Sequence, residues 1–434
     1  MSLDLAEPLS EFEALIDPKT GVIQSVSLVK SSEIDPDVFV AYASPCDTEA
    51  LTGLKAANRG AASSPVKERA VLRACGESVE RYCSAIFAMG ELRIATMDEL
   101  AREGSRFVDV RDLYPFADEQ YALREFPYER PDAKPLRWTC GRSIIDDGDV
   151  WLPASCVYVP YLFDRAVEPF THMPISTGLA AGRSVESCIQ KGLLEILERD
   201  ALMIVWSARL LAPRLEVKTC AGLSPVVDAL LDVKRTGAAW HLNWLTLDVD
   251  IPIVSAALID PADPPRTSFG IAADPDPVRA VMLALEEATL TRVLVNQTLD
   301  SEGDFDEDEI RTLRDHMLVH ARSSDLRARL GFLEEGQMRS FDDLSGGARR
   351  DDAPGVVECV AEAGFEPSWV DITSEDIAQF GFRVVRTVIP GMQPLDNDHR
   401  YRYLGGPRIF SVPPALGFPG VTLDSLNPDP HPFP

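Results

Sequence analysis

The sequence of 434 residues lacks the signals of membrane insertion and export. No apolar stretch reaches the roughly 20 residues that a bilayer-spanning helix needs. The opening run MSLDLAEPLSEFEALID has neither the basic region nor the apolar region of a secretory signal peptide. The 8 cysteines include no C-x-x-C pair, so no ligand set for a structural zinc ion is visible. These absences indicate a cytoplasmic protein without a membrane anchor.

Positive charge is also scarce. The chain has 42 lysines and arginines against 69 aspartates and glutamates, its formal net charge is −27, and no basic block stands out. Nucleic acids and anionic membranes attract proteins through a cationic surface, so both are disfavoured as partners. The length suits two average domains or one large domain, and the hydrophobic fraction of 45% is that of an ordinary globular protein.

The familiar nucleotide-binding motifs are missing. The sequence contains no G-x-x-x-x-G-K-[ST] phosphate loop, and it has neither the glycine-rich loop nor the H-R-D motif of protein kinases. A nucleotide bound by this chain would therefore be held by a different arrangement of residues.

Charged residues instead occur inside apolar helical segments. Two segments share the pattern E-x-x-E-R: Glu77, Glu80 and Arg81 in ACGESVERYC, and Glu195, Glu198 and Arg199 in GLLEILERDA. A third apolar segment, LEEATLTR, carries Glu286, Glu287 and Arg292. Beyond this echo we find no strict repeat in the sequence.

Each E-x-x-E pair places two carboxylates on one face of a helix. Burying carboxylates without a cation is very costly, and hard divalent ions take oxygen ligands. Glutamate pairs from different helices, with arginines nearby, therefore suggest a Mg²⁺-nucleotide site in which arginine meets phosphate. A single such motif is more often an ordinary ion-pair patch, but its recurrence in two apolar helices favours a shared function.

Periodicity and turn residues place these motifs on helices. Asp276 and Pro277 are typical of a helix start. We expect strand-like pieces around 107–165, VWLPASCVYVPYLF (150–163) among them, and alternating helix and strand over 354–390. We further expect helices at about 66–90, 185–210 and 274–295, and strands at 240–248 and 251–259.

These residues carry a resemblance to a known family. STGLAAGRSVESCIQKGLLEILERDA (176–201) resembles the signature of YcaO-domain proteins, and the other two glutamate helices match the family's E-x-x-E-R and E-A-x-Q-x-R helices. The similarity covers essentially the whole chain. Further segments resemble the azoline-forming branch of the family: LIDPKTGVIQSV, DLYPFADEQYA, TLRDHMLVHA and VIPGMQPLDNDHRYRYLG.

The resemblance implies a fold and an activity. It implies an α+β fold of mixed and antiparallel sheets packed with the glutamate helices. It also implies an ATP- and Mg²⁺-dependent cyclodehydratase, which phosphorylates a backbone amide oxygen of a ribosomally made peptide and converts Cys, Ser or Thr to azolines. By position, the implied Mg²⁺ ligands are Glu77, Glu80, Glu195 and Glu198. The implied nucleotide-binding residues are those four with Arg81, Arg183, Glu186, Arg199, Glu287 and Arg292.

The last five residues, PHPFP, match the P-x-P-x-P ending that is typical of azoline-forming members. A proline-rich tail favours stiff, extended geometry. The resemblance implies that the tail reaches the active site and that the carboxylate of Pro434 helps proton transfer there. Proline-rich ends taken alone are often only disordered tails.

Several positions depart from the family pattern. Arg183, Ser187 and Leu290 stand where asparagine, glutamate and glutamine are expected, and the G-K-G loop before the first glutamate helix is not clear. Arg183 could supply the positive charge of the missing lysine. These changes keep open a non-catalytic scaffold subunit, and a third possibility is a YcaO enzyme that uses another nucleophile to form thioamides or amidines.

The expected partners follow from the domain layout. We expect an N-terminal segment (1–50), a YcaO domain (51–410) and a proline-rich tail (411–434). A leader-binding winged helix has no visible place, so we expect a stand-alone component that works with a separate partner related to ubiquitin-activating enzymes on a leader-bearing precursor peptide. A homodimer is a further family-based expectation. His316 and His320 could bind a metal, but a packing role is favoured.

Overall fold

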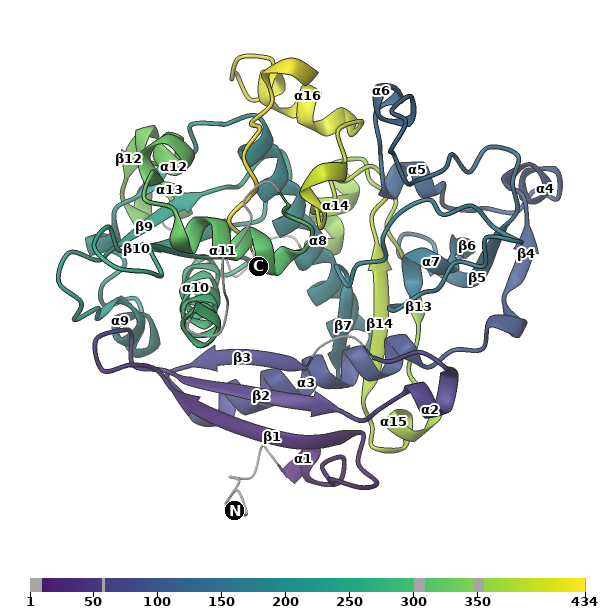
Figure 1. Cartoon of the computed structure of the whole chain (residues 1–434), viewed down its shortest axis with the longest axis horizontal. Helices are drawn as coiled ribbons and strands as arrows, with labels where there is room; N and C mark the ends of the chain where they lie inside the picture. Colours follow the sequence, from purple (N-terminus) through teal and green to yellow (C-terminus); the bar gives the residue numbers. More distant parts are fainter. Residues whose placement is uncertain (1–9, 57–58, 300–308, 347–354, 434) are drawn as a thin grey trace.

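The computed structural model describes residues 10–56, 59–299, 309–346 and 355–433 (Figure 1). Within these residues the strands form three sheets. The smallest has the order β1-β2-β3 and is antiparallel: β1 (Ile23–Lys30), β2 (Phe39–Pro45) and β3 (Gly60–Ser64). Strands β1 and β2, which precede residue 50, therefore pair in one sheet with β3, which follows it.

The other two sheets lie above the first sheet in Figure 1. One has the order β4-β5-β13-β14-β7, with β6 paired to β5: β4 (Arg93–Ala95), β5 (Leu136–Ser143), β6 (Asp149–Pro153), β7 (Leu179–Gly182), β13 (Ser368–Asp371) and β14 (Arg383–Val388). The other has the order β11-β10-β9-β8-β12: β8 (Arg214–Leu215), β9 (Ala239–Trp244), β10 (Ile253–Ile259), β11 (Thr267–Ala273) and β12 (Met338–Arg339). The mixed α+β architecture agrees with the predicted fold class.

Three strands each lead directly into a long helix, which gives three strand–helix units. The units are β3 with α3 (Lys67–Ala85), β7 with α8 (Val185–Ser207), and β11 with α10 (Pro277–Leu299). Each helix contacts its own strand and the strand of another unit: α3 contacts β7, α8 contacts β11, and α10 contacts β3. The three units therefore close into a ring.

Glycine permits the close approach of strand to helix in two of these units. A Cβ atom on Gly60 would lie 2.1 Å from the carbonyl oxygen of Ala74 on α3. A Cβ atom on Gly270 would lie 2.3 Å from the backbone nitrogen of Ala288 on α10. Any side chain at these positions would push the strand away from the helix.

Helix α8 lies in the middle of the molecule because it is apolar almost all round. Its last seven residues, from Ala201 to Ser207, are all buried. It packs against β14 and β11 and against α16 (Pro407–Ala415), so it connects two of the sheets (Figure 1). A helix with this degree of burial keeps its charged residues only where they have a partner or a function.

The helices predicted at 66–90, 185–210 and 274–295 and the strands predicted at 240–248 and 251–259 agree with α3, α8, α10, β9 and β10 apart from their ends. The stretch 107–165, predicted as strand-like, also contains the short helices α5 (Val110–Leu113) and α6 (Asp118–Tyr121). The helix that was expected to begin at Asp276 does so, because the side chain of Asp276 accepts a hydrogen bond from the backbone nitrogen of Val278 at 2.9 Å. The stretch 150–163 was predicted as strand-like. Strand β6 ends at Pro153, however, and the short helix α7 (Ala154–Val157) follows. In the described part of the chain, no helix is both long and apolar enough to cross a bilayer.

The C-terminal segment returns to the centre of the molecule. After α16, residues 427–433 run back beside α11 (Leu313–Arg322), where Pro430 and His431 contact His320 and His316 (Figure 1). Phe433 is 4% exposed and belongs to the largest hydrophobic cluster. The described part of the C-terminal segment therefore belongs to the packed structure.

Candidate functional site

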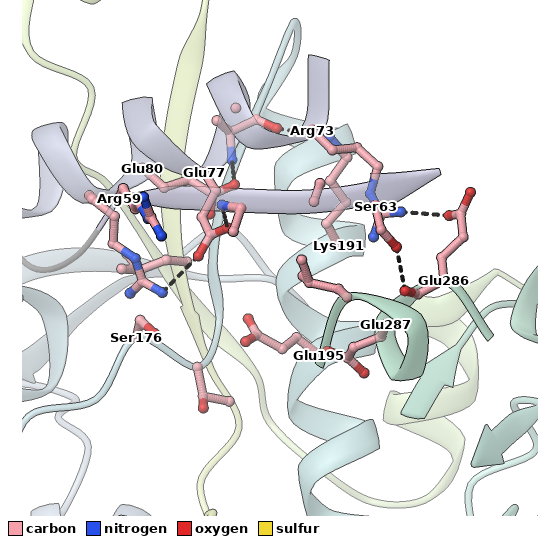
Figure 2. A pocket seen from close by; sticks show the side chains of 18 of the residues that line it. Arg59, Ser63, Arg73, Glu77, Glu80, Ser176, Lys191, Glu195, Glu286 and Glu287 are labelled. Carbon is pink, nitrogen blue, oxygen red and sulfur yellow. Dashed lines mark hydrogen bonds and ion pairs between the residues drawn. The ribbon is translucent and has the colours of Figure 1, made fainter. Parts of the chain in front are cut away.

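A cavity of about 1380 Å³ lies where α3, α8 and α10 converge (Figure 2). Residues from all three strand–helix units line it, as do residues from α11 and the C-terminal segment. The charged residues on its wall are Arg59, Arg73, Glu77, Glu80, Arg81, Arg183, Lys191, Glu195, Arg199, Glu286, Glu287 and Arg314. Figure 2 shows Glu77 and Glu80 on one side of the cavity and Glu195 and Glu287 on the other.

The two glutamates of α3 are held by backbone amides of two different strands. Glu77 accepts a hydrogen bond from the backbone nitrogen of Ala61 on β3 at 2.9 Å. Glu80 accepts one from Ala181 on β7 at 2.7 Å. Each of these bonds uses one carboxylate oxygen.

The same arrangement recurs in the other two units. Glu195 on α8 accepts a hydrogen bond from the backbone nitrogen of Gly178 at 2.9 Å, and Glu287 on α10 accepts one from Ile271 at 2.7 Å. Glu198 accepts one from Ala273 on β11 at 2.8 Å. The first glutamate of each helix thus binds the chain at or just before its own strand. On α3 and α8 a second glutamate, three residues later, binds the strand of the next unit, whereas α10 has Leu290 at this position.

Burial and mutual repulsion act on these carboxylates. Burial, and next the charge of Glu77, raise the pKa of Glu80 to about 8. Burial raises the pKa of Glu198 to about 8 despite Arg199, and it raises the pKa of Glu287 as well. Carboxylates that resist ionisation in this way are stabilised in their charged form by a bound cation. The donor set is all oxygen, which is what Mg²⁺ prefers.

The arginines of the two E-x-x-E-R motifs lie against these carboxylates. Arg81 is 3.1 Å from Glu77. Arg199 is 3.5 Å from Glu195 and 3.4 Å from Glu198, and its guanidinium group lies 3.9 Å from the ring centre of Phe433. Arg199 therefore connects the carboxylates of α8 to the C-terminal segment.

Arg292 does not reach the cavity, contrary to the prediction. It is fully buried, and its Nε donates to Asp35 at 2.6 Å. Arg81 and Arg199 come four residues after the first glutamate of their helices, whereas Arg292 comes five residues after Glu287. Five residues turn a helix about 140° away from the starting face, so Arg292 points to the opposite side. Thr291 occupies the equivalent position and lines the cavity.

Three other predicted residues have distinct surroundings. Glu186 is exposed in the first turn of α8 and is not among the lining residues, whereas its neighbour Ser187 is. Arg183 lines the cavity, where it donates to the carbonyl oxygen of Phe380 at 2.8 Å and stacks on Phe382 at 3.8 Å. Glu198 is 14% exposed and lies next to Arg199 but is not among the lining residues. Pro434 lies outside the described residues.

Lys191 is a lining residue that the sequence patterns did not reveal. It precedes Glu195 by one helical turn, and its Nζ donates to the carbonyl oxygen of Ala181 at 2.8 Å. The backbone nitrogen of the same Ala181 binds Glu80. The ammonium group thus lies close to the carboxylates of α3. Its one signal in the sequence was its position, four residues before Glu195 on the same helical face.

Glu286 has a different role from the other glutamates. It is fully buried, and Arg73 on α3 lies 2.6 Å from its carboxylate. Its backbone carbonyl accepts a hydrogen bond from Ser63 on β3. Figure 2 shows both contacts. They fasten α10 to the first strand–helix unit and so close the ring.

Together, the fold and the cavity define a class of proteins: an α+β scaffold that presents oxygen ligands and guanidinium groups from three helices to one site. The family model described as "YcaO cyclodehydratase, ATP- and Mg2+-binding" matches residues 63–393. The chain belongs to the YcaO family. The family's description names ATP and Mg²⁺, the two cofactors that the sequence predicted.

Solved structures with the same fold support the assignment. A heterocyclase in complex with substrate and cofactor is 23% identical, with a TM-score of 0.77, over 98% of this chain and 56% of the other. The YcaO protein of Methanopyrus kandleri, bound with AMPPCP and Mg²⁺, is 22% identical, with a TM-score of 0.60, over 86% of both chains. The first of these comparisons shows that our chain spans little more than half of that heterocyclase.

A relative of similar sequence comes from Methanothermobacter thermautotrophicus. This uncharacterized protein is 28% identical over 271 residues, which is 61% of our chain and 67% of its own length.

Proposed function

We propose that the protein is an ATP-dependent cyclodehydratase that converts Cys, Ser or Thr residues of a ribosomally made precursor peptide to azolines. The observation that carries the proposal is the ring of fixed carboxylates at the cavity. Five glutamates from three helices each bind one backbone amide, and four of them, all but Glu198, line the cavity. Membership of the YcaO family and the heterocyclase fold support the same reaction.

In the proposed site, Glu77, Glu80, Glu195 and Glu198 hold Mg²⁺. Each uses one oxygen for a backbone amide, and the other oxygen would bind the metal. In Glu77, Glu195 and Glu198 the metal would share that oxygen with Arg81 or Arg199. The metal would supply charge neutralisation for phosphoryl transfer. Arg81, Arg199 and Lys191 face the phosphates of ATP. Phosphoryl transfer depends on positioning and charge neutralisation, which is what these residues provide.

The proposed reaction has two parts. A side-chain thiol or hydroxyl adds to the carbon of the preceding amide, which leaves the former carbonyl oxygen as an alkoxide or hydroxyl. That oxygen takes the γ-phosphoryl group of ATP, and ADP is released. The ring nitrogen then expels phosphate as its proton is removed, so the peptide has lost one water in total. We propose that the terminal carboxylate of Pro434 moves protons in these steps.

The departures from the family pattern do not favour a scaffold protein. Arg183, Ser187 and Leu290 all line the cavity, yet the fixed carboxylates are complete around them. Lys191 binds the carbonyl oxygen of Ala181, two residues before Arg183, and adds a second cation there. We expected Arg183 to replace the positive charge of the lysine that is missing from the G-K-G loop. A YcaO enzyme that uses another nucleophile would share this same site, and product mass separates the two reactions.

The partners are part of the proposal. We propose that a leader-bearing precursor peptide is presented by a separate leader-binding protein related to ubiquitin-activating enzymes. A structural neighbour is the Escherichia coli microcin synthetase McbBCD complex, to which this chain is similar with a TM-score of 0.62 at 12% identity. We further propose a cytoplasmic location and a homodimer.

The test is the mass of the peptide after incubation with the protein, its candidate partner and Mg²⁺-ATP. We expect losses of whole water molecules, one for each ring. Glu195→Gln removes a charge from the cavity and should abolish these losses, whereas the surface variant Glu362→Gln should keep them. A gain of mass from sulfur-for-oxygen exchange would instead identify thioamide formation. An unchanged peptide would contradict both.

A further inference from the structure

Four of the 6 histidines of the chain lie in or beside the C-terminal segment. On α11, a ring nitrogen of His320 (Nε2) lies 2.7 Å from the carbonyl oxygen of Pro430, and one of His316 (Nδ1) lies 3.2 Å from that of His431. His431 Nε2 in turn lies 2.7 Å from the carbonyl oxygen of Asp396. At the edge, His399 Nε2 lies 2.9 Å from the carbonyl oxygen of Pro428.

Each of these contacts fixes the protonation state of its ring. A carbonyl oxygen only accepts, so the contacting nitrogen of each ring must carry a proton. The other nitrogens of His316, His320 and His431 are buried and have no hydrogen-bond partner. A second proton on any of these rings would bury a charged N–H group without an acceptor. The docked segment therefore requires all three rings to be neutral.

The rings also crowd one another. His316 and His431 stack with their ring centres 4.0 Å apart, and His316 and His399 are 5.7 Å apart. His316, His320 and His431, which we call the histidine cluster, are at most 1% exposed. In the described parts of the chain, no group of three or more His, Cys, Asp or Glu side chains could hold a metal ion. The histidine cluster is therefore not a metal site.

Few opposite charges compensate for a protonated ring. The charged groups around the cluster and His399 are Asp315, Arg329, Asp396, Arg402 and Asp429. Asp396 already binds Arg402 at 3.3 Å and the backbone nitrogen of Tyr403. Arg329 and Arg402 oppose protonation of the neighbouring rings.

We propose that His316, His320 and His431 are positioning residues that, as neutral rings, hold residues 430–433 in place with Phe433 at the cavity, and that their protonation releases this segment. The proposal rests on the proposed function in one respect: the seated segment then serves the azoline-forming reaction. Residues 427–429 have anchors that do not titrate, such as Trp206, which donates to the carbonyl oxygen of Asp429 at 2.9 Å. Release is therefore confined to the last residues.

The direction of the pH effect follows from the neutral rings. Burial lowers the pKa of His316 to about 3 and that of His320 to about 4, and it holds the pKa of His431 well below the usual value of 6.5. A released ring regains its ordinary pKa. Docking is therefore fully favoured above pH 6.5 and is lost as the pH falls below it. For each ring that takes up a proton on release, the equilibrium constant for release rises about tenfold for each unit by which the pH falls below 6.5.

Fluorine NMR of para-fluorophenylalanine at position 433 measures docking directly. Phe433 lies against the guanidinium group of Arg199, so the docked and released rings differ in environment. The chain is titrated alone from about pH 8 to about pH 5, the range in which free histidine changes charge, without ATP, peptide or partner. We expect a docked signal at the upper end and a steep transition to a released signal below pH 6.5.

Variants of His320 identify the groups that titrate. Glutamine at this position places an amide nitrogen near the donor position of Nε2 but cannot take up a proton. H320Q should therefore keep the segment docked at high pH and lower the steepness of release by about tenfold per pH unit. H320L offers no donor and should show the released signal throughout. His241 lies on β9, away from the C-terminal segment, and faces Glu334. H241Q is therefore the matched control and should titrate like the wild type.

A docked signal that persists to about pH 5 in the wild type would overturn the proposal. So would H320Q releasing with the wild-type steepness. If H320L fails to fold, the wild-type and H320Q titrations still decide. The measurement involves no turnover, so a chain that docks and releases its tail but forms no azoline would refute the proposed function and leave this inference standing.

Discussion

Single residues at the cavity differ in how their charges are used. Glu77, Glu80 and Glu195 each have one oxygen on a backbone amide, which fixes the carboxylate without neutralising it. Glu286 instead pairs with an arginine of another helix, Arg73, which lies 2.6 Å away, whereas Arg81 and Arg199 pair with glutamates of their own helices. The first kind of glutamate can bind a cation, and the second kind connects two helices. Neighbouring residues such as Glu286 and Glu287 can therefore have separate roles.

Lys191 provides the first prediction at this scale. We expect Lys191→Gln to raise the KM for ATP about tenfold, because a charge-assisted contact to phosphate is lost. The value of kcat should change less. Lys218, whose side chain is 78% exposed and lies outside the cavity, provides the control variant Lys218→Gln. An unchanged KM for Lys191→Gln would show that this lysine only holds the carbonyl of Ala181.

Arg292 provides the second prediction. Arg292→Met leaves Asp35 buried without its main partner, and such losses cost about 3–5 kcal/mol in the free energy of unfolding. Urea unfolding measures this loss, and the KM for ATP of the folded fraction should stay the same. Arg279→Met is the control on the same helix, because that side chain is 61% exposed. A raised KM with unchanged stability would restore Arg292 to the nucleotide site.

At the scale of elements, the three strand–helix units explain what the sequence revealed and what it did not. The E-x-x-E spacing was visible because both glutamates share a helix face. The third unit breaks the pattern, since Leu290 occupies the position equivalent to Glu80 and Glu198. The equivalence became visible only from the hydrogen bonds to the strands, because those contacts join residues that are far apart in the sequence.

The error over Arg292 has the same origin. Sequence similarity placed an arginine near the glutamates of the third helix but did not take account of the turn of the helix. One residue of offset rotates a side chain by about 100°, which is enough to move it from the cavity to the core. The contact with Asp35 could not be predicted, because it joins positions 257 residues apart.

The C-terminal segment gives a prediction at this scale. Deleting residues 430–434 removes Phe433 from Arg199 and leaves the glutamates in place. We expect ring formation to be lost, while the affinity for Mg²⁺-ATP changes by no more than about fivefold, since one cation–π contact is weak. Calorimetry and peptide mass measure the two effects. A deletion variant that still forms rings would exclude a role for Pro434.

For the whole molecule, the net charge of −27 and the ring of carboxylates at the cavity both attract cations. In the proposed site Mg²⁺ binds the folded cavity and not the unfolded chain, so we expect it to stabilise the fold by about 2.7 kcal/mol at a hundred times its Kd. Thermal unfolding in MgCl₂ and in NaCl of equal ionic strength separates this effect from screening. Glu195→Gln should reduce the difference between the two salts. Equal melting temperatures would contradict a metal site.

The α+β fold class was implied by the resemblance to the YcaO family. The helices that carry the site could be predicted from the sequence, because apolar periodicity and the helix start at Asp276 are local signals. The contributions of Lys191, Ser63 and the histidine cluster could not. Each depends on a contact with a distant backbone group, and a lone lysine or histidine carries no pattern of its own. His316 and His320 were expected to have a packing role, and the structure places them against the C-terminal segment.

The central claim is that this site transfers the γ-phosphoryl group of ATP to a backbone amide oxygen. The most direct measurement uses a precursor peptide labelled with heavy oxygen. The label is in the backbone carbonyl of the residue directly before the one that is cyclised. We predict that the heavy oxygen appears in the released phosphate, one atom for each ring, and that Glu195→Gln releases none. Heavy oxygen found in water, with unlabelled phosphate, would contradict the account.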